Sequence, residues 1–104
     1  MENKPICEVD KDGTKRWFLN GLYHREDGPA YEGFTGTKSW WFNGKRHRVD
    51  GPAIIESNGR KYWYINGKNV TKQITEWVIE QDIDLDNLTD EDTLLIKLKL
   101  LISD

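Results

Sequence analysis

Three short aromatic-rich runs recur along the chain, and each run ends at an Asn-Gly pair. In the first run, Trp17 and Leu19 fall on one side of the alternation and Phe18 falls on the other. The two later runs repeat this division, with Trp40 and Phe42 opposite Trp41, and with Trp63 and Ile65 opposite Tyr62 and Tyr64. A period of two residues is typical of a β-strand, and Asn-Gly is the strongest short signal for a hairpin turn. The pattern therefore predicts three strands that each lead into a hairpin.

The three runs belong to one unit that recurs at a spacing of 23 residues. Residues 14–30 read TKRWFLNGLYHREDGPA, and residues 37–53 read TKSWWFNGKRHRVDGPA, so the two segments align without a gap. A third copy starts at residue 60 as RKYWYINGKNV and ends before the HRxDGPA segment. A fixed period of this length is the signature of stacked structural units.

The repeat predicts a mainly β fold with a C-terminal α-helical part. One hairpin unit cannot bury its own aromatic face, but stacked units can. We therefore expect a twisted β-meander or a short open solenoid, with Trp17, Trp40 and Trp63 forming a ladder in its core. The predicted repeat domain spans residues 1–70, with units of about 5–30, 31–53 and 54–70. Its first strand is expected at Pro5-Ile6-Cys7-Glu8.

The remaining residues, 71–104, predict a tail of two short helices. Thr71 is expected to be the N-cap of the first helix, and Thr89 with Asp92 resembles a capping box at the start of the second. The second helix is expected to run to about Ile102 with apolar residues on nearly all sides, which predicts burial all round. The tail either packs on the repeats and caps them, or pairs with a second copy of the chain.

The 23-residue unit resembles MORN-type hairpin repeats, and it is more similar still to the HRxDGPA repeats of small phage and bacterial proteins. The resemblance covers residues 5–70. It departs from the MORN pattern because Trp, Asn-Gly and HRxDGPA stand where Gly and Tyr dominate that pattern. The resemblance implies binding to proteins or lipids rather than catalysis.

The HRxDGPA segments hold the residues that invite a chemical interpretation: His24, Arg25 and Asp27, followed by His47, Arg48 and Asp50. A functional interpretation makes each His a general base or a metal ligand that the Asp orients. The structural interpretation, which we favour, pairs Arg with Asp and packs His on a neighbouring Trp. Repetition at a fixed period is what scaffold residues show.

The net charge of −3 is unevenly distributed. Residues 1–72 carry 13 Lys and Arg against 9 Asp and Glu, whereas residues 73–104 carry 2 against 9. A basic group lies in units two and three, close in sequence to Trp41, Tyr62 and Tyr64; it comprises Lys45, Arg46, Arg48, Arg60, Lys61 and Lys68. Such a surface can stack bases and hold phosphates, or it can bind a protein. A third possibility is that the helical tail covers this face.

The acidic tail contains Asp82, Asp84 and Asp86 at the spacing of the first three ligands of an EF-hand loop. Asn87 stands where that loop needs Gly, and Thr93 stands where it needs a bidentate Glu. We therefore expect a solvated loop, with imitation of phosphate charges as an alternative. The three carboxylates remain candidates for binding a partner.

Taken together, these features predict a non-enzymatic protein-binding module without a cofactor or a metal. Cys7 is the single cysteine, so no disulfide can form within the chain. The polar N-terminal segment and the lack of a long apolar run predict a cytoplasmic protein away from membranes. The resemblance to phage proteins suggests a stoichiometric inhibitor of a host defence protein or nuclease. There are two alternatives. One is a homodimer through the second helix, and the other is a nucleic-acid or nucleotide binder that uses the basic aromatic face.

Overall fold

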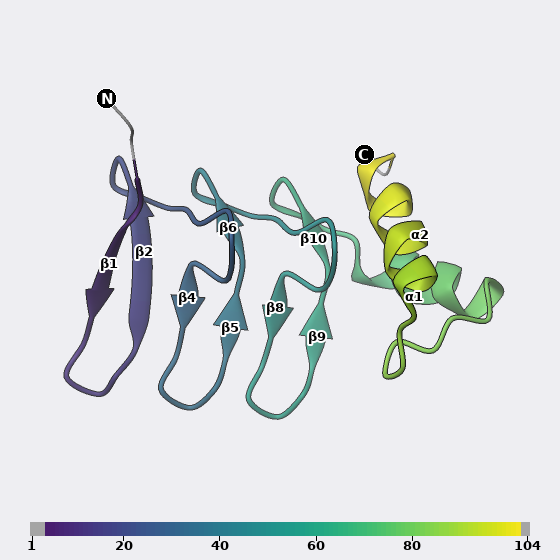
Figure 1. The fold of residues 1–104 in the computed structure, drawn as a ribbon, viewed down its shortest axis with the longest axis horizontal. Helices are drawn as coiled ribbons and strands as arrows, with labels where there is room; N and C mark the ends of the chain where they lie inside the picture. Colours follow the sequence, from purple (N-terminus) through teal and green to yellow (C-terminus); the bar gives the residue numbers. More distant parts are fainter. Residues whose placement is uncertain (1–3, 103–104) are drawn as a thin grey trace.

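The computed structural model describes residues 4–102 and shows a mainly β protein with two C-terminal helices (Figure 1). Six strands form an antiparallel meander in the order β1-β2-β4-β5-β8-β9, and β3 joins this sheet by pairing with β2. Two further ladders each contain two strands, β6-β7 and β10-β11. The strands are β1 (Ile6–Val9), β2 (Lys15–Leu19), β3 (Leu22–Tyr23), β4 (Tyr31–Glu32), β5 (Lys38–Ser39), β6 (Trp41–Phe42), β7 (Lys45–Arg46), β8 (Ile54–Ile55), β9 (Lys61–Tyr62), β10 (Tyr64–Ile65) and β11 (Lys68–Asn69). The helices are α1 (Thr71–Glu80) and α2 (Asp90–Leu101).

The predicted hairpins are present at all three Asn-Gly pairs. Asn20, Asn43 and Asn66 have φ values of 52°, 49° and 48°, and the glycine that follows each has a φ of 79°, 80° and 83°. Two successive residues with positive φ make a type I′ turn, whose twist matches that of the flanking strands. The expected first strand is present, one residue later than predicted: β1 spans Ile6–Val9 and pairs with β2. The outermost parts of the predicted domains, residues 1–3 and 103–104, lie outside the described residues.

Backbone hydrogen bonds recur at the spacing of the sequence repeat. The N–H of Trp17 donates to the carbonyl of Ala30 at 2.8 Å, and the N–H of Trp40 donates to that of Ala53 at 2.7 Å. Both alanines are fully buried. These bonds join the aromatic strand of each of the first two units to the end of its own HRxDGPA segment.

The prediction of a buried indole ladder is wrong for two of the three tryptophans. Trp17 and Trp40 are half-buried, whereas Trp63 is buried. No ring contact within residues 4–102 joins two of these indoles. An arginine of the HRxDGPA segment covers each of the first two rings instead, and the helices cover the third.

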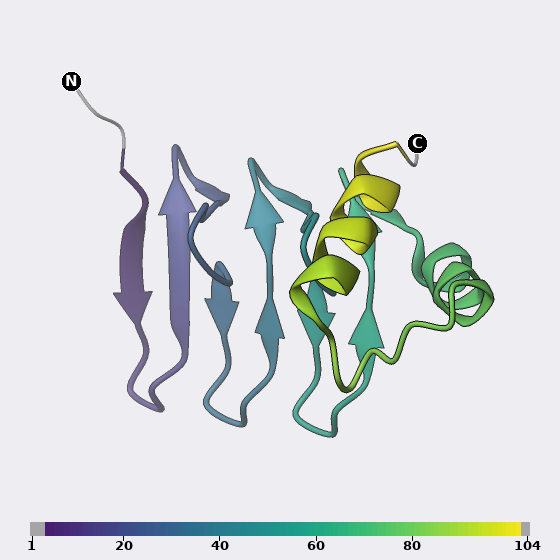
Figure 2. The same cartoon turned by 45° about the vertical axis from the view of Figure 1, so that its right-hand side comes forward.

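The hydrophobic core lies at the C-terminal end of the sheet, where α1 and α2 pack against Trp63 (Figures 1 and 2). Its buried members are Trp63, Val70, Ile74, Val78, Ile96 and Leu100. The hydroxyl oxygen of Thr71 accepts a hydrogen bond from the N–H of Trp63 at 2.9 Å. Thr71 is therefore not the N-cap that we predicted: α1 begins at Thr71, and Val70 occupies the cap position without a side-chain bond.

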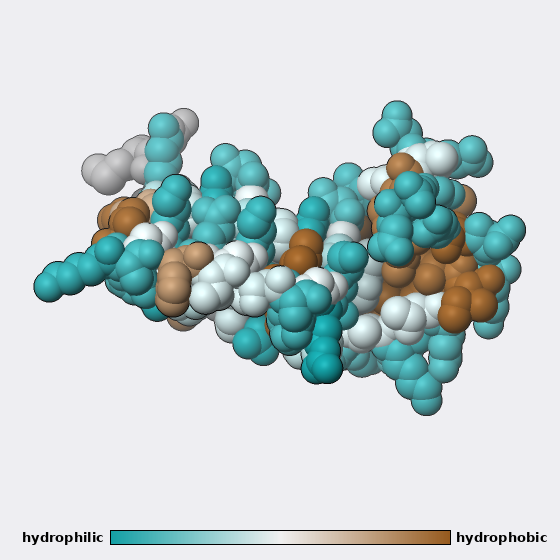
Figure 3. All heavy atoms as spheres, turned by 90° about the horizontal axis from the view of Figure 1, so that it is seen from below, coloured by the Kyte–Doolittle hydropathy of each residue, from teal (hydrophilic) through white to brown (hydrophobic). Residues whose placement is uncertain are grey.

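The start of α2 confirms the predicted capping box, because Thr89 and Asp92 exchange both side-chain to backbone hydrogen bonds. The prediction that α2 is buried all round is wrong. Ile96 and Leu100 are buried, but Leu94, Leu98 and Leu101 are 56%, 51% and 57% exposed. One short helix and one sheet end can cover only a single side of α2. Figure 3 shows hydrophobic residues gathered at the helical end of the molecule.

Candidate protein-binding face

The register of the sheet places the second set of aromatic residues on one face. Directly opposed residues share a face of a sheet, and four successive pairs connect Arg16 to Tyr31, Ser39, Ile54 and Tyr62. Two positions further along the chain, Phe18 in β2, Trp41 in β6 and Tyr64 in β10 extend the same face. So do Tyr23 and Arg46, the hairpin partners of Phe18 and Trp41. We call this surface the aromatic face; it consists of Arg16, Phe18, Tyr23, Tyr31, Ser39, Trp41, Arg46, Ile54, Tyr62 and Tyr64.

Five side chains on the aromatic face form a continuous column across the three hairpins. Tyr23 stacks on Phe18 in its own hairpin, with ring centres 4.8 Å apart, and on Trp41 in the next, at 5.1 Å. The guanidinium of Arg46 then lies 4.9 Å from the centre of the Trp41 ring and 5.5 Å from that of Tyr64. All five are half-buried. Stacked rings and cation–π contacts hold their side chains in place while leaving part of each accessible.

The helices pack on the opposite face of the sheet, which corrects the alternative in which the tail covers the aromatic face. Trp63 and Ile65, which contact α1 and α2 in the core, alternate with Tyr62 and Tyr64 along the chain. Lys61 reaches the same tail, with its Nζ atom 3.9 Å from an oxygen of Asp86. Within residues 4–102, the two helices therefore leave the aromatic face uncovered.

The structure brings together some of the predicted partner-binding residues and separates others. Trp41, Arg46, Tyr62 and Tyr64 share the aromatic face. Lys45 does not, because it pairs with Phe42 on the other side of the β6-β7 ladder. Arg60 is exposed in the turn before β9. The three candidate carboxylates lie apart from this face, in the loop between α1 and α2: Asp82, Asp84 and Asp86.

A hollow of about 270 Å³ lies in the middle of the aromatic face. Its lining includes Tyr23, Tyr31, Ser39, Trp41 and Arg46. The indole N–H of Trp41 donates to the hydroxyl oxygen of Ser39 at 2.6 Å. Ser39 and the two tyrosines were not among the residues predicted from sequence. The sequence offers one signal, because Ser39 is a small residue at a position where the neighbouring units carry the large residues Arg16 and Tyr62.

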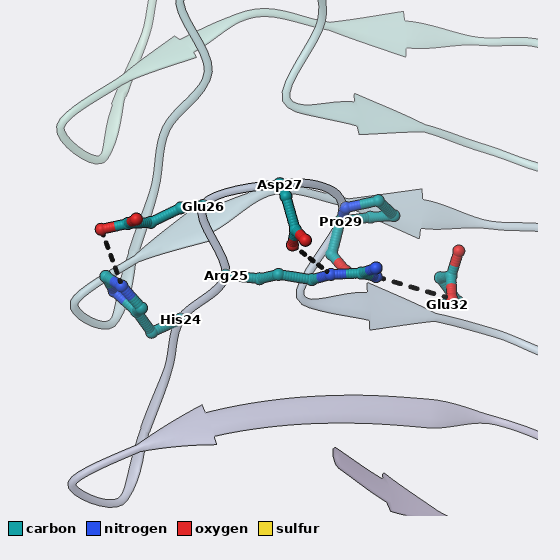
Figure 4. Close-up of polar contacts among 6 residues, drawn as sticks. All are labelled: His24, Arg25, Glu26, Asp27, Pro29 and Glu32. Atoms are coloured by element: carbon teal, nitrogen blue, oxygen red, sulfur yellow. Dashed lines mark hydrogen bonds and ion pairs between the residues drawn. The ribbon is translucent and has the colours of Figure 1, made fainter. Parts of the chain in front are cut away.

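The arginine of each HRxDGPA segment lies on the tryptophan of its own unit, and we call such a segment with its arginine a clasp. The guanidinium of Arg25 lies 3.9 Å from the centre of the Trp17 ring. Its Nε donates to Asp27 at 3.0 Å and its Nη1 donates to the carbonyl of Pro29 at 3.1 Å, while Glu32 lies 4.0 Å away (Figure 4). Arg48, Trp40, Asp50 and Pro52 repeat these contacts in the second unit. The predicted pairing of Arg with Asp is confirmed.

The glycine of each clasp leaves room for this arginine. A Cβ atom at Gly28 would lie 2.9 Å from the Arg25 guanidinium carbon, and one at Gly51 would lie 2.7 Å from that of Arg48. A side chain at either position would have to displace the guanidinium from its place over the indole. The Gly in HRxDGPA therefore serves a close approach between backbone and guanidinium.

The two histidines connect neighbouring units. The Nδ1 atom of His24 accepts a hydrogen bond from the N–H of Asn43 at 3.0 Å, and His47 does the same for Asn66. His24 packs on Phe42, with ring centres 4.4 Å apart, rather than on a tryptophan as predicted. Burial lowers the pKa of His47 below its usual value. An Nδ1 atom that accepts a hydrogen bond belongs to a neutral imidazole, so these contacts account for the histidines as inter-unit acceptors.

A second hollow, of about 550 Å³, lies between the two clasps. Its lining includes Arg25 and Arg48, which are both paired with carboxylates.

In the acidic loop, Asp84 accepts hydrogen bonds from the N–H of Asp86 and the side chain of Asn87, which lower the pKa of Asp84. Within residues 4–102, no three His, Cys, Asp or Glu side chains are placed to hold a metal ion. Neither helix in that range is long and apolar enough to cross a bilayer.

Comparison of the chain with protein-family models, with curated proteins and with solved structures finds no match.

Proposed function

We propose that this protein is a non-enzymatic protein-binding module and that the aromatic face is its binding surface. The observation that carries the proposal is the ordered column of rings and guanidinium that the helices leave uncovered. Trp, Tyr and Arg supply most of the binding energy at protein interfaces. Rings that are already held by their neighbours lose little conformational freedom when a partner binds.

The column favours a protein partner over the nucleic-acid alternative. Single-stranded nucleic acids bind by stacking bases on the open faces of aromatic rings. Here Tyr23 already stacks on Phe18 and Trp41, and the next contact of Trp41 is the Arg46 guanidinium. A base could enter the column only by breaking one of these contacts.

The finer form of the proposal is that the protein is a stoichiometric inhibitor of a host defence protein or nuclease and acts in the bacterial cytoplasm. This form rests on the resemblance of the HRxDGPA units to those of small phage proteins. Occupation of one site on a partner needs only a rigid complementary surface, which the stacked hairpins supply.

The test compares two substitutions on one strand that point to opposite faces. Tyr62→Lys places a charge on the aromatic face, and Lys61→Gln changes the neighbouring residue on the helix-covered face. We expect affinity capture from a bacterial lysate to recover a partner with the wild type and with Lys61→Gln but not with Tyr62→Lys. Circular dichroism checks that both variants fold. Equal recovery by all three proteins would reject the aromatic face as the binding surface.

The nucleic-acid alternative has its own signature in the same proteins. Binding of a single-stranded oligonucleotide that weakens steeply as salt rises, and that Tyr62→Lys abolishes, would replace the proposed function with nucleic-acid binding.

A second proposal concerns self-association through α2. Leu94, Leu98 and Leu101 are exposed at the spacing i, i+4, i+7, so they form one stripe along the helix. The first turn of α2 is acidic and its last turn holds Lys99. An antiparallel pair of α2 helices about a two-fold axis would bury both stripes and bring opposite charges together.

A further inference from the structure

At two positions of the aromatic face that line the hollow of the middle unit, each of the three units carries a different residue. Ser39 occupies the position of Arg16 in the first unit and Tyr62 in the third. Arg46 occupies the position of Tyr23 in the first unit and Asn69 in the third. Residues that only support the scaffold recur from unit to unit, as the clasp residues do. The residues at these two positions are therefore not fixed by the scaffold, and Ser39 and Arg46 give the middle unit a surface of its own.

Ser39, at the first of these positions, lines the hollow of about 270 Å³. A serine takes up far less space than the Arg or Tyr of the neighbouring units. Tyr23 and Trp41 stack beside the gap, and Tyr31 lies opposite Ser39 in the β4-β5 pair. The hydroxyl of Ser39 accepts the indole N–H of Trp41, so its own hydrogen is free to donate to a ligand.

Arg46, at the second of these positions, places a positive charge at the edge of this hollow. Arg16, Arg25 and Arg48 each lie beside a carboxylate. Arg46 has no such partner within residues 4–102, and its Nε atom is buried without a hydrogen bond. Stacking between Trp41 and Tyr64 holds the guanidinium in place. A fixed guanidinium without a counter-ion is a ready site for an oxyanion.

We propose that the hollow receives a carboxylate side chain of a protein partner, which pairs with Arg46 and accepts a hydrogen bond from Ser39. One guanidinium and neutral hydroxyls match a single negative charge better than a phosphate chain. The chain also carries a net charge of −3, which opposes the approach of a polyanion. The aromatic walls suit the methylene groups of a glutamate. This inference rests on the proposed function in one respect, which is that the carboxylate belongs to a protein partner.

The site can be tested without knowledge of the partner. The probe is a hexapeptide of glutamate with acetyl and amide ends, and the matched control is the same peptide of glutamine. We expect the glutamate peptide to shift the NMR signals of the Trp41 indole N–H and the Arg46 Nε–H in a saturable way. The glutamine peptide should leave both signals in place. A Trp41→Phe variant assigns the indole signal.

Three variants of the full chain locate the binding. Arg46→Tyr and Ser39→Tyr install residues that the neighbouring units already carry at these positions, so the hairpins are expected to fold. Each should weaken binding of the glutamate peptide about tenfold or more, because one loses the charge and the other fills the hollow. Arg60→Gln removes an exposed cation outside the hollow and should leave the affinity unchanged.

The outcomes separate this inference from the proposed function. No saturable shift up to about 10 mM peptide, or equal binding by wild type and Arg46→Tyr, would overturn the carboxylate site. Tighter binding of an oligothymidylate than of the glutamate peptide, lost in Arg46→Tyr, would reassign the site to phosphate. If Tyr62→Lys alone abolishes partner capture, the proposed function stands even when the peptide fails to bind.

Discussion

The guanidinium carbon of Arg48 lies 3.9 Å from the centre of the Trp40 ring. The same guanidinium donates to Asp50 and to the carbonyl of Pro52. One side chain therefore covers an indole, neutralises a carboxylate and holds the turn of its own segment. The identical contacts of Arg25 with Trp17 explain why HRxDGPA is copied from unit to unit.

Arg48→Lys should destabilise the protein although it preserves the charge. A lysine cannot stack as a planar group on Trp40 while donating to both Asp50 and the Pro52 carbonyl. We expect the free energy of unfolding to fall by about 1–3 kcal/mol, measured by urea titration. Arg60→Lys, in an exposed turn, is the control and should change stability by less than about 0.5 kcal/mol. Equal effects of the two changes would mean that the clasp contributes nothing beyond its charge.

Gly51→Ala should destabilise the protein by about 1–3 kcal/mol through overpacking. The added methyl would lie 2.7 Å from the guanidinium carbon of Arg48. A double-mutant cycle with Arg48→Ala isolates this contact, because the added methyl has no guanidinium to clash with in that background. We expect Gly51→Ala to cost much less in the Arg48→Ala background. Strict additivity of the two changes would contradict the clash.

Stability should decline as the pH falls below the usual His47 pKa of 6.5. Burial lowers the pKa of His47 in the folded protein, so in this range the unfolded chain binds more protons than the folded chain. The contribution is fully present above pH 6.5 and is lost as the pH falls through the folded pKa. Urea titrations between about pH 7.5 and pH 5.5 check the trend. In His47→Asn, which keeps an acceptor near Asn66, the decline should be smaller, whereas an unchanged decline would assign it to other groups.

Thr71→Val should destabilise the junction between the sheet and α1. The hydroxyl oxygen of Thr71 accepts the N–H of Trp63, whose counterparts in the first two units donate to alanine carbonyls. Valine keeps the shape but leaves this donor unpaired beside a buried indole, at a cost of about 1–3 kcal/mol. Thermal unfolding followed by Trp fluorescence measures the loss. Thr71→Ser restores the hydroxyl and should recover most of the stability; if it does not, the methyl group rather than the hydrogen bond matters.

Leu98→Lys tests the proposed pairing of α2 helices. The wild type should show the mass of a dimer by light scattering at high concentration, and the variant should show that of a monomer. Because Leu98 is exposed in the single chain, the variant is expected to fold normally. Lys97→Gln, at the neighbouring position outside the leucine stripe, serves as the control. A wild type that stays monomeric up to about 1 mM would remove the homodimer from consideration.

Local sequence features were sufficient to determine the hairpins, their spacing and the start of α2. Asn-Gly specifies a type I′ turn through the φ values of two adjacent residues, and the alternation between Phe18 and Trp17 follows from the two-residue period of a strand. The Thr89–Asp92 box likewise involves residues three positions apart. These features depend on neighbours along the chain, so a single sequence contains them.

Only the tertiary structure decided which face of the sheet the helices cover and what fills the space between units. Both faces carry aromatic residues, so alternation alone could not tell whether α1 would pack on Trp63 or on Tyr64. The arginine layers over Trp17 and Trp40 and the hollow beside Ser39 depend on contacts between residues far apart along the chain. The sequence alone determines the period-two pattern that separates two faces. The packing of the apolar tail then determines which of them remains open, because one tail can cover only one face.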